Sequence, residues 1–262
     1  MSRETGRLTV LHVSDVHGTR DGRLYGRVDG VARLRDVGDY VRRTGITPEA
    51  IVVTGDLVER GHGDAYHLVR EAFDELERTA AAPVLSVLGN HDDPARAHAL
   101  RGHERAHHRV VRIDELRFVL LDSSSGALGE AQLDWLRVQL REPHGIGTIV
   151  ALHHPPIGSP MPVLAQAGLR DAEAFLEAIE RSDVRAVLAG HFHHPLSASL
   201  RGVPVWVGPS LAYHQVMDAG PDRVSGHDRP MFSLIHLTPT AVTATGIGLE
   251  SPAPLFTSSL TR

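Results

Sequence analysis

The stretch Ile51-Val52-Val53-Thr54-Gly55-Asp56 gives the strongest indication of the fold. Its three consecutive β-branched residues form a short apolar run that is typical of a buried central strand. The run ends at a turn of small residues that leaves one carboxylate exposed. The sequence therefore predicts a strand that holds Asp56 at its carboxyl end.

The same pattern occurs four more times, each time as an apolar run followed by side chains that can bind a metal. The runs cover Leu8–Val13, Val84–Leu88, Ile149–Leu152 and Val184–Leu188. The polar residues that follow them are Asp15 and His17, Asn90 and His91, His153, and His191 and His193. In an open α/β sheet, ligands bind at the carboxyl ends of the strands. We therefore predict that these five strand ends converge on one site.

The segments between the strands predict helices that cover the sheet. Apolar residues at helical spacing indicate helices over residues 31–43, 64–76 (with Asp64 as N-cap), 129–140 and 172–179 (after Asp171 as cap), and a short helix carrying four histidines near residues 98–108. Residues 109–113 and 117–122 predict an antiparallel pair. Short strands over 196–200, 203–207, 232–237 and 241–245 predict a closing meander.

Length and composition limit the possible functions. With 262 residues, we expect one domain over residues 1–246 and an extended tail over residues 247–262. The absence of cysteine excludes disulfides, thiolate metal sites and cysteine nucleophiles. A net charge of -5 indicates no nucleic-acid partner and favours a small substrate. No apolar run approaches the length of a transmembrane segment, so we expect a cytoplasmic protein.

The residues at the strand ends are suitable ligands for two metal ions. Imidazole, carboxylate and amide donors without thiolate suit Mn, Fe or Zn. We assign Asp15, His17 and His193 to one ion and Asn90, His153 and His191 to the other, with Asp56 shared by both. Two ions about 3.5 to 4 Å apart lower the pKa of a shared water and clamp a phosphoryl group for in-line attack. This predicts phosphoester hydrolysis without a covalent enzyme intermediate.

Five motifs of the chain resemble those of the calcineurin-like metallophosphoesterases, in the order that this family has them. They are Asp15-Val16-His17, Gly55-Asp56, Gly89-Asn90-His91-Asp92, His153 and Gly190-His191-Phe192-His193. Segments 24–26, 151–156 and 183–190 are similar to the class III cyclic nucleotide phosphodiesterases of this family. The resemblance covers residues 8–237. It implies an α/β fold built as a four-layer αββα sandwich, a binuclear site, a homodimer, and hydrolysis of 3′,5′-cyclic nucleotides such as cAMP to 5′-monophosphates.

The resemblance also implies a catalytic role for His91, because the family places this position against the substrate rather than the metal. His91 could protonate the departing 3′-oxygen or donate a hydrogen bond to the phosphoryl group. A general acid is worth roughly 10²- to 10⁴-fold in rate. With Asp56, His91 therefore completes the predicted catalytic residues.

Other functions of the same fold remain open at this point. Purple acid phosphatases carry a tyrosine ligand where this chain has Glu59, and protein Ser/Thr phosphatases carry glutamate where it has Asp92. Residues 55–61 nevertheless resemble the protein phosphatase stretch, with Arg60 as a possible phosphate ligand. The alternatives are a broad-specificity phosphodiesterase, a phosphomonoesterase or protein phosphatase, and an interaction scaffold without metal.

Several polar residues near the motifs allow more than one role. Asp92 could orient a metal ligand or cap the helix after Pro94, and we expect His154 to support or pack against the ligands. Tyr25 could line a nucleotide pocket, form a dimer contact or pack within its loop. Contact of Arg60 or Glu59 with substrate is left open. Alternation with Arg and Glu predicts that four further histidines lie on a solvated face: His98, His103, His107 and His108.

Overall fold

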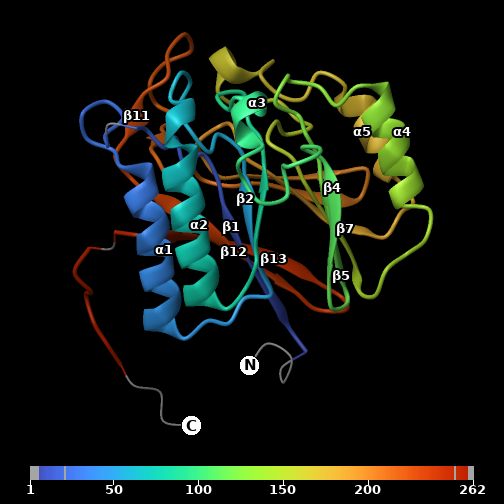
Figure 1. Ribbon diagram of the computed structural model, residues 1–262, viewed down its shortest axis with the longest axis horizontal. Coiled ribbons are helices and arrows are strands. Elements are labelled where there is room, and N and C mark those ends of the chain that lie inside the picture. The colour runs from blue at the N-terminus through green and yellow to red at the C-terminus, as the bar shows by residue number, and fades with distance from the viewer. Residues whose placement is uncertain (1–5, 21, 251, 259–262) are drawn as a thin grey trace.

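The computed structural model describes residues 6–20, 22–250 and 252–258 of the chain. Two stacked β-sheets form its centre and pairs of helices cover their outer faces, which gives four layers (Figure 1). Helices α1 (Gly30–Thr44) and α2 (Tyr66–Ala80) cover one sheet. Helices α4 (Glu130–Gln139) and α5 (Ala172–Ile179) cover the other. The predicted α/β sandwich is confirmed.

The first sheet has the strand order β13-β12-β1-β2-β3. Its strands are β1 (Leu8–Val13), β2 (Ala50–Thr54), β3 (Val84–Val87), β12 (Met231–Leu237) and β13 (Val242–Gly248). Strands β1, β2 and β3 are parallel, whereas β12 and β13 form an antiparallel hairpin beside β1. The carboxyl ends of the three parallel strands therefore lie at one edge of the sheet.

The second sheet has the strand order β4-β5-β6-β7-β9-β8. Its strands are β4 (Arg109–Ile113), β5 (Leu116–Leu120), β6 (Gly147–Ala151), β7 (Val184–Ala189), β8 (Leu196–Leu200) and β9 (Val203–Val207). Strands β5, β6, β7 and β9 are parallel, and the edge strands β4 and β8 are antiparallel to their neighbours. The predicted antiparallel pair corresponds to β4 and β5.

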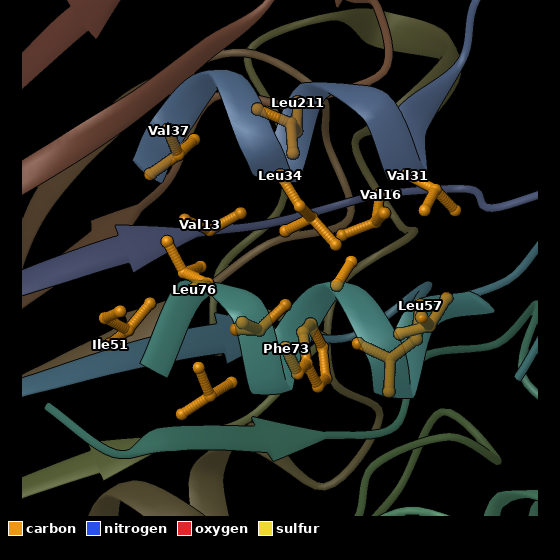
Figure 2. Packing of buried hydrophobic residues seen from close by; sticks show 14 of the residues in the cluster. Val13, Val16, Val31, Leu34, Val37, Ile51, Leu57, Phe73, Leu76 and Leu211 are labelled. Carbon is orange, nitrogen blue, oxygen red and sulfur yellow. The ribbon is translucent and has the colours of Figure 1, made fainter. Parts of the chain in front are cut away.

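Strand β2 is buried along its whole length because its side chains enter two different cores. Ile51 packs with the residues of α1 and α2, whereas Val52 packs between the two sheets. Figure 2 shows the first of these cores, with Leu34 of α1 and Phe73 and Leu76 of α2 directed toward the strands. A strand covered on both faces needs apolar residues at every position, which explains the continuous run in the sequence.

The predicted closing meander is wrong. Strands β8 and β9 form a hairpin that extends the second sheet, whereas β12 and β13 extend the first. The chain between them crosses from one sheet to the other and includes a short ribbon of β10 (His214–Gln215) and β11 (Gly226–His227). Strand β13 continues to Gly248, three residues beyond its expected end. The division into residues 1–246 and 247–262 stays a prediction.

Two local predictions fail, and a third holds in position only. Asp64 does not cap α2, because it lies in the 3-10 turn Gly63–Ala65 and pairs with Arg96 instead. Helix α3 (Pro94–Ala97) ends before the four histidines, so residues 98–108 form turns rather than a helix. Asp171 is the N-cap residue of α5 as predicted, but its carboxylate accepts hydrogen bonds from the loop before α4 rather than from the helix. Short polar side chains accept hydrogen bonds from loop backbone as readily as from helix ends, so helix caps are difficult to predict from the sequence.

None of the helices in the described part of the chain combines the length and the apolar composition needed to cross a membrane.

Candidate metal centre

The loops that follow β1, β2, β3, β6 and β7 bring all seven predicted ligands together. Asp56 Oδ2 lies 3.5 Å from His17 Nε2 and 3.5 Å from His153 Nε2. His17 Nε2 lies 3.1 Å from His193 Nε2, which is 3.4 Å from Asp15 Oδ1. These side chains, which follow different strands, therefore lie close together in the fold, and their assignment as metal ligands stays a prediction.

A second group of donors lies on the other side of Asp56. His153 Nε2 is 3.1 Å from Asn90 Oδ1 and 3.2 Å from His191 Nδ1. The buried ring of His154 lies 4.4 Å from that of His191, measured between centroids, and its Nδ1 is 3.4 Å from Ser123 Oγ. His154 thus lies beside the group, and the structure leaves its expected supporting role as a prediction.

In three of the histidines, hydrogen bonding at Nδ1 leaves the Nε2 lone pair, which faces the other ligands, available to a cation. His17 Nδ1 donates to Glu59 Oε2 at 2.7 Å, and His153 Nδ1 donates to the Thr54 carbonyl at 2.8 Å. His193 Nδ1 donates to the Tyr213 carbonyl at 3.2 Å. A carboxylate or carbonyl on one ring nitrogen fixes the proton there, so the other nitrogen presents its lone pair. Lone pairs facing each other at about 3 Å repel unless a cation lies between them, so the donor set fits metal ions.

The backbone at the site is unusual, because five of the seven predicted ligands have positive φ. The values are 52° for Asp15, 48° for His17, 48° for Asp56, 77° for His191 and 54° for His193. Each such residue costs on the order of 1–3 kcal/mol and persists only where its surroundings hold it. These strained backbone conformations lower the stability of the fold, but they direct the five side chains toward one point.

The glycines of the motifs are required by the close approach of these loops. A Cβ at Gly89 would lie 2.2 Å from Asp56 Oδ1, and one at Gly190 would lie 1.9 Å from Ser14 Oγ. No side chain fits at such distances, so only glycine allows the strand ends to approach. The motif glycines thus act through packing rather than chemistry.

The electrostatics of the site favour ionised Asp15 and Asp56 carboxylates and a neutral His191 imidazole. Burial would raise the pKa of Asp15 and of Asp56, but the neighbouring histidines hold the pKa of both carboxyls below its usual range. Burial lowers the pKa of His191 to about 3. At neutral pH Asp15 and Asp56 therefore offer carboxylate oxygens, and His191 offers an imidazole lone pair, to a cation.

Glu59 links the metal-binding residues to His91, a role that the sequence analysis left open. Its Oε2 accepts from His17 and its Oε1 accepts a hydrogen bond from His91 Nδ1 at 3.0 Å. The bond to Glu59 is the main reason that the pKa of His91 is raised. The backbone nitrogen of His91 donates to Asp56 Oδ1 at 2.8 Å, and its partly exposed ring lies at the mouth of the site.

Asp92 connects two loops and does not cap α3. Asp93 is the cap, because its Oδ1 accepts from the backbone nitrogens of Ala95 and Arg96. The Asp92 carboxylate accepts from the backbone nitrogens of Leu57, Val58 and Gly89 and from the hydroxyl of Tyr66. It thereby joins the loop of Asp56 to the loop of Asn90.

Arg60 and Tyr25 border the site. Arg60 Nη2 donates to the Asn90 carbonyl at 3.0 Å, which holds its side chain next to a predicted ligand. Tyr25 is 75 % exposed, and its ring meets that of Tyr213 edge to face at 5.8 Å between centroids. The Tyr213 ring in turn lies 4.2 Å from His193.

The four histidines after α3 do not share a solvated face. His103 is fully buried, and its Nε2 lies 3.0 Å from Ser86 Oγ. His107 and His108 are partly buried, and only His98 is exposed. The prediction of a solvated face is therefore wrong for His103, because residues 98–108 fold back onto the chain.

Comparison with known proteins agrees with this geometry. Residues 8–195 match the family model described as calcineurin-like phosphoesterase. The chain belongs to this family. It is 37 % identical to a probable cyclic nucleotide phosphodiesterase of Rhodococcus erythropolis, over 84 % of this chain and 76 % of the relative. It is 36 % identical to a cAMP/cGMP dual specificity phosphodiesterase of Mycobacterium tuberculosis, over 89 % of this chain and 77 % of the relative.

A solved structure supports the fold independently. The crystal structure of a dimetal phosphatase from Danio rerio superposes with a TM-score of 0.62 at 16 % identity, covering 93 % of this chain and 96 % of that one. The family and the relatives together make this calcineurin-like phosphoesterase a metal-dependent phosphodiesterase.

Proposed function

We propose that this phosphoesterase hydrolyses 3′,5′-cyclic nucleotides, among them cAMP, to 5′-monophosphates with two bound metal ions. The position of Asp56 carries the proposal, because its Oδ2 lies 3.5 Å from both His17 Nε2 and His153 Nε2. One carboxylate oxygen between two groups of donors is what two ions with a shared ligand require. The names of the two bacterial relatives support the choice of substrate.

In this proposal Asp56 is shared between the ions. Residues Asp15, His17 and His193 hold one ion, and residues Asn90, His153 and His191 hold the other. Nitrogen and oxygen donors suit Mn, Fe or Zn. When bound, the two ions would supply an activated water and neutralise charge on the phosphoryl group.

His91 is the proposed proton donor to the departing 3′-oxygen. Its ring lies at the mouth of the site, edge to face with His17 at 4.8 Å between centroids. Glu59 fixes the orientation of the His91 ring through Nδ1, so Nε2 is the nitrogen left to face the substrate. An ionised Glu59 also favours the protonated imidazole, which is the form that can donate.

The test is kcat/KM for cAMP on protein loaded with Mn²⁺, with bis(p-nitrophenyl) phosphate measured in parallel as a diester without a nucleoside. A value of roughly 10⁴ M⁻¹s⁻¹ or more for cAMP would support the proposal. Good turnover of the generic diester with feeble turnover of cAMP would contradict the substrate but not the metal centre. Activity on phosphomonoesters alone would contradict the proposed diester substrate but not the metal centre.

The homodimer implied by the family resemblance stays a prediction. Sedimentation velocity on the Mn²⁺-loaded protein would test it, with a single monomer species as the contradicting result.

A further inference from the structure

Three hydrogen-bonding side chains lie beneath the candidate metal centre and have no role in the site described above. They are His12 of β1, Ser14 of the loop that follows β1, and Thr54 of β2, and all three are fully buried. His12 Nε2 lies 2.9 Å from Thr54 Oγ1, and Thr54 Oγ1 lies 2.8 Å from Ser14 Oγ. Ser14 Oγ lies 3.2 Å from the Thr54 carbonyl oxygen. These three side chains form the buried network.

The hydrogen bonds of the buried network run in one direction. The Ser14 hydroxyl donates to the Thr54 carbonyl, because a carbonyl oxygen can only accept. The single Ser14 proton is then in use, so the Thr54 hydroxyl donates to Ser14 Oγ. His12 Nε2 therefore carries the proton of its bond with Thr54 Oγ1. Each hydroxyl accepts one hydrogen bond and donates the next, an arrangement in which successive bonds strengthen one another.

The buried network ends at a carbonyl that holds a predicted metal ligand. The Thr54 carbonyl accepts from Ser14 Oγ and also from His153 Nδ1, at 2.8 Å. The bond to His153 fixes the proton of that ring on Nδ1 and leaves Nε2 for an ion. The position of the Thr54 carbonyl therefore determines where His153 Nε2 points.

His12 is an unfavourable residue for this place unless its donor is needed. Its Nδ1 is buried and has no hydrogen-bond partner among the described residues. Burial lowers the pKa of His12 to about 3, so the ring is neutral and Nε2–H is its one donor. A buried polar atom without a partner costs about 1–3 kcal/mol, and an apolar residue such as the neighbouring Val10 would avoid this cost. Exceptions of this kind are expected where a side chain has a function.

The surrounding loops leave the buried network little room to shift. A Cβ at Gly208 would lie 2.7 Å from His12 Cε1, and a Cβ at Gly190 would lie 2.8 Å from the Thr54 carbonyl oxygen. The backbone at two glycines thus packs directly against both ends of the network. Such close packing holds the Thr54 carbonyl in one position.

From these observations we infer that His12, Ser14 and Thr54 are positioning residues for His153, and that they set the affinity of the ion that His153 binds. This inference rests on the two-ion centre of the proposed function but not on its substrate. Residues that orient a metal ligand typically change metal affinity by about 10- to 100-fold.

The other ion should not depend on the buried network. Its two histidines are held by different groups, since His17 Nδ1 donates to Glu59 and His193 Nδ1 donates to the Tyr213 carbonyl. A change in the buried network should therefore affect the two ions unequally. A purely structural role would instead affect both of them.

The experiment is a calorimetric titration of the metal-free protein with Mn²⁺. The unmodified protein should bind two ions per chain. Thr54→Val keeps the shape of the side chain but removes its hydroxyl, so it should weaken one ion by about 10- to 100-fold and leave the other unchanged. Thr54→Ser restores the hydroxyl and should recover the lost affinity. If Thr54→Val does not fold, Ser14→Ala interrupts the same network and should show the same selective loss.

A matched control removes a buried hydroxyl outside the network. Ser233 of β12 is fully buried, and its Oγ accepts from Trp206 Nε1 at 3.0 Å. Ser233→Ala should leave the affinity of both ions unchanged. Weakening of one ion in this control to the same extent as in Thr54→Val would overturn the inference.

Two backgrounds show which ion is affected. If Thr54 acts through His153, adding Thr54→Val to His153→Ala should cause no further loss of affinity. Adding it to His193→Ala should weaken the remaining ion by about 10- to 100-fold. Equal losses in the two backgrounds would overturn the inference.

The role of His12 has its own pair of variants. His12→Leu removes the donor to Thr54 and should weaken the same ion as Thr54→Val. His12→Gln supplies an amide N–H in place of Nε2–H and should bind that ion more tightly than His12→Leu. Unchanged affinity in His12→Leu would overturn the assignment of His12.

The outcomes separate this inference from the proposed function. Selective loss of one ion in Thr54→Val, without turnover of cAMP by the unmodified protein, would support the positioning role and contradict cyclic nucleotide hydrolysis. Turnover of cAMP with two ions that are equally tight in Thr54→Val and the unmodified protein would contradict the positioning role and leave the proposed function supported. Binding of a single ion by the unmodified protein would overturn both.

Discussion

Two groups of histidines in this molecule differ in what surrounds them. At the candidate metal centre, histidines meet the buried carboxylates of Asp15 and Asp56, and carbonyl or carboxylate groups hold their outer nitrogens. In the turns after α3, His103 uses Nε2 toward Ser86 and places Nδ1 3.1 Å from His107 Nδ1. The positive charge of Arg109 acts on His103 there.

The comparison shows that closely spaced histidines are not enough to indicate a metal site. Burial lowers the pKa of His103 to about 3, so this ring is neutral at pH 7. Among the described residues, the second group does not supply three metal-binding side chains within 4.8 Å of one another, whereas the first group does.

The largest effect is expected for Asp56→Asn. The amide keeps the shape of the side chain but removes the charge that lies between the two donor groups. We expect kcat/KM for bis(p-nitrophenyl) phosphate to fall by about 10⁴-fold or more, with loss of bound metal, because the activated water depends on the ions. Mass spectrometry of the metal content and steady-state kinetics would measure both. Retention of two ions with normal activity would remove Asp56 from the site.

The next effect is expected for His91→Gln. A proton donor that does not hold metal should be worth roughly 10²- to 10⁴-fold in kcat. The metal content should stay at the level of the unaltered protein, which separates this variant from Asp56→Asn. If the metal is lost as well, His91 is a ligand and the assigned role is wrong.

A smaller effect is expected for Glu59→Gln, together with a change in pH dependence. Residues that support a ligand are typically worth about 10- to 100-fold. The carboxylate raises the pKa of His91, and the protonated imidazole is the donating form, so activity should fall as pH rises through that pKa. Without the carboxylate, the pKa of His91 falls and the alkaline limb of the kcat profile moves to lower pH. An unmoved limb would contradict the coupling between Glu59 and His91.

The smallest effect on activity is expected for His103→Gln in the second group. Activity and metal content at pH 7 should stay within about twofold, because His103 contacts Ser86, His98 and His107 rather than any predicted metal ligand. Loss of metal in this variant would show that the second group also binds a cation.

The same variant should change how stability depends on pH. His103 has a folded pKa of about 3, below the unfolded value, so the unfolded chain binds the proton first as pH falls. Its contribution to stability is therefore present above about pH 6.5 and lost progressively toward pH 3. Urea unfolding would measure the free energy of unfolding at pH 7 and at pH 5. Between these pH values it should decrease in the unmodified protein by about 2 kcal/mol more than in His103→Gln. An equal decrease in the free energy of unfolding in both proteins would contradict a His103 that is buried in its neutral form.

The parallel strands and the polar residues that follow them could be predicted from the amino-acid sequence alone. A strand buried on both faces requires a continuous apolar run, as in Ile51 and Val52, and such a run is visible without any structure. The carboxyl ends of parallel strands share one edge, so the convergence of Asp56 with His17 and His153 also followed from the order of the motifs.

The side chains that support this site became visible only in the folded protein. Glu59 joins His17 to His91, Asp92 joins two loops, and Tyr213 holds His193 through its carbonyl, although 20 residues or more separate the partners in each case. Local sequence signals report on neighbouring residues along the chain, whereas these contacts depend on how distant loops pack. For the same reason, the assignment of the last strands to two sheets could not be predicted from their apolar pattern.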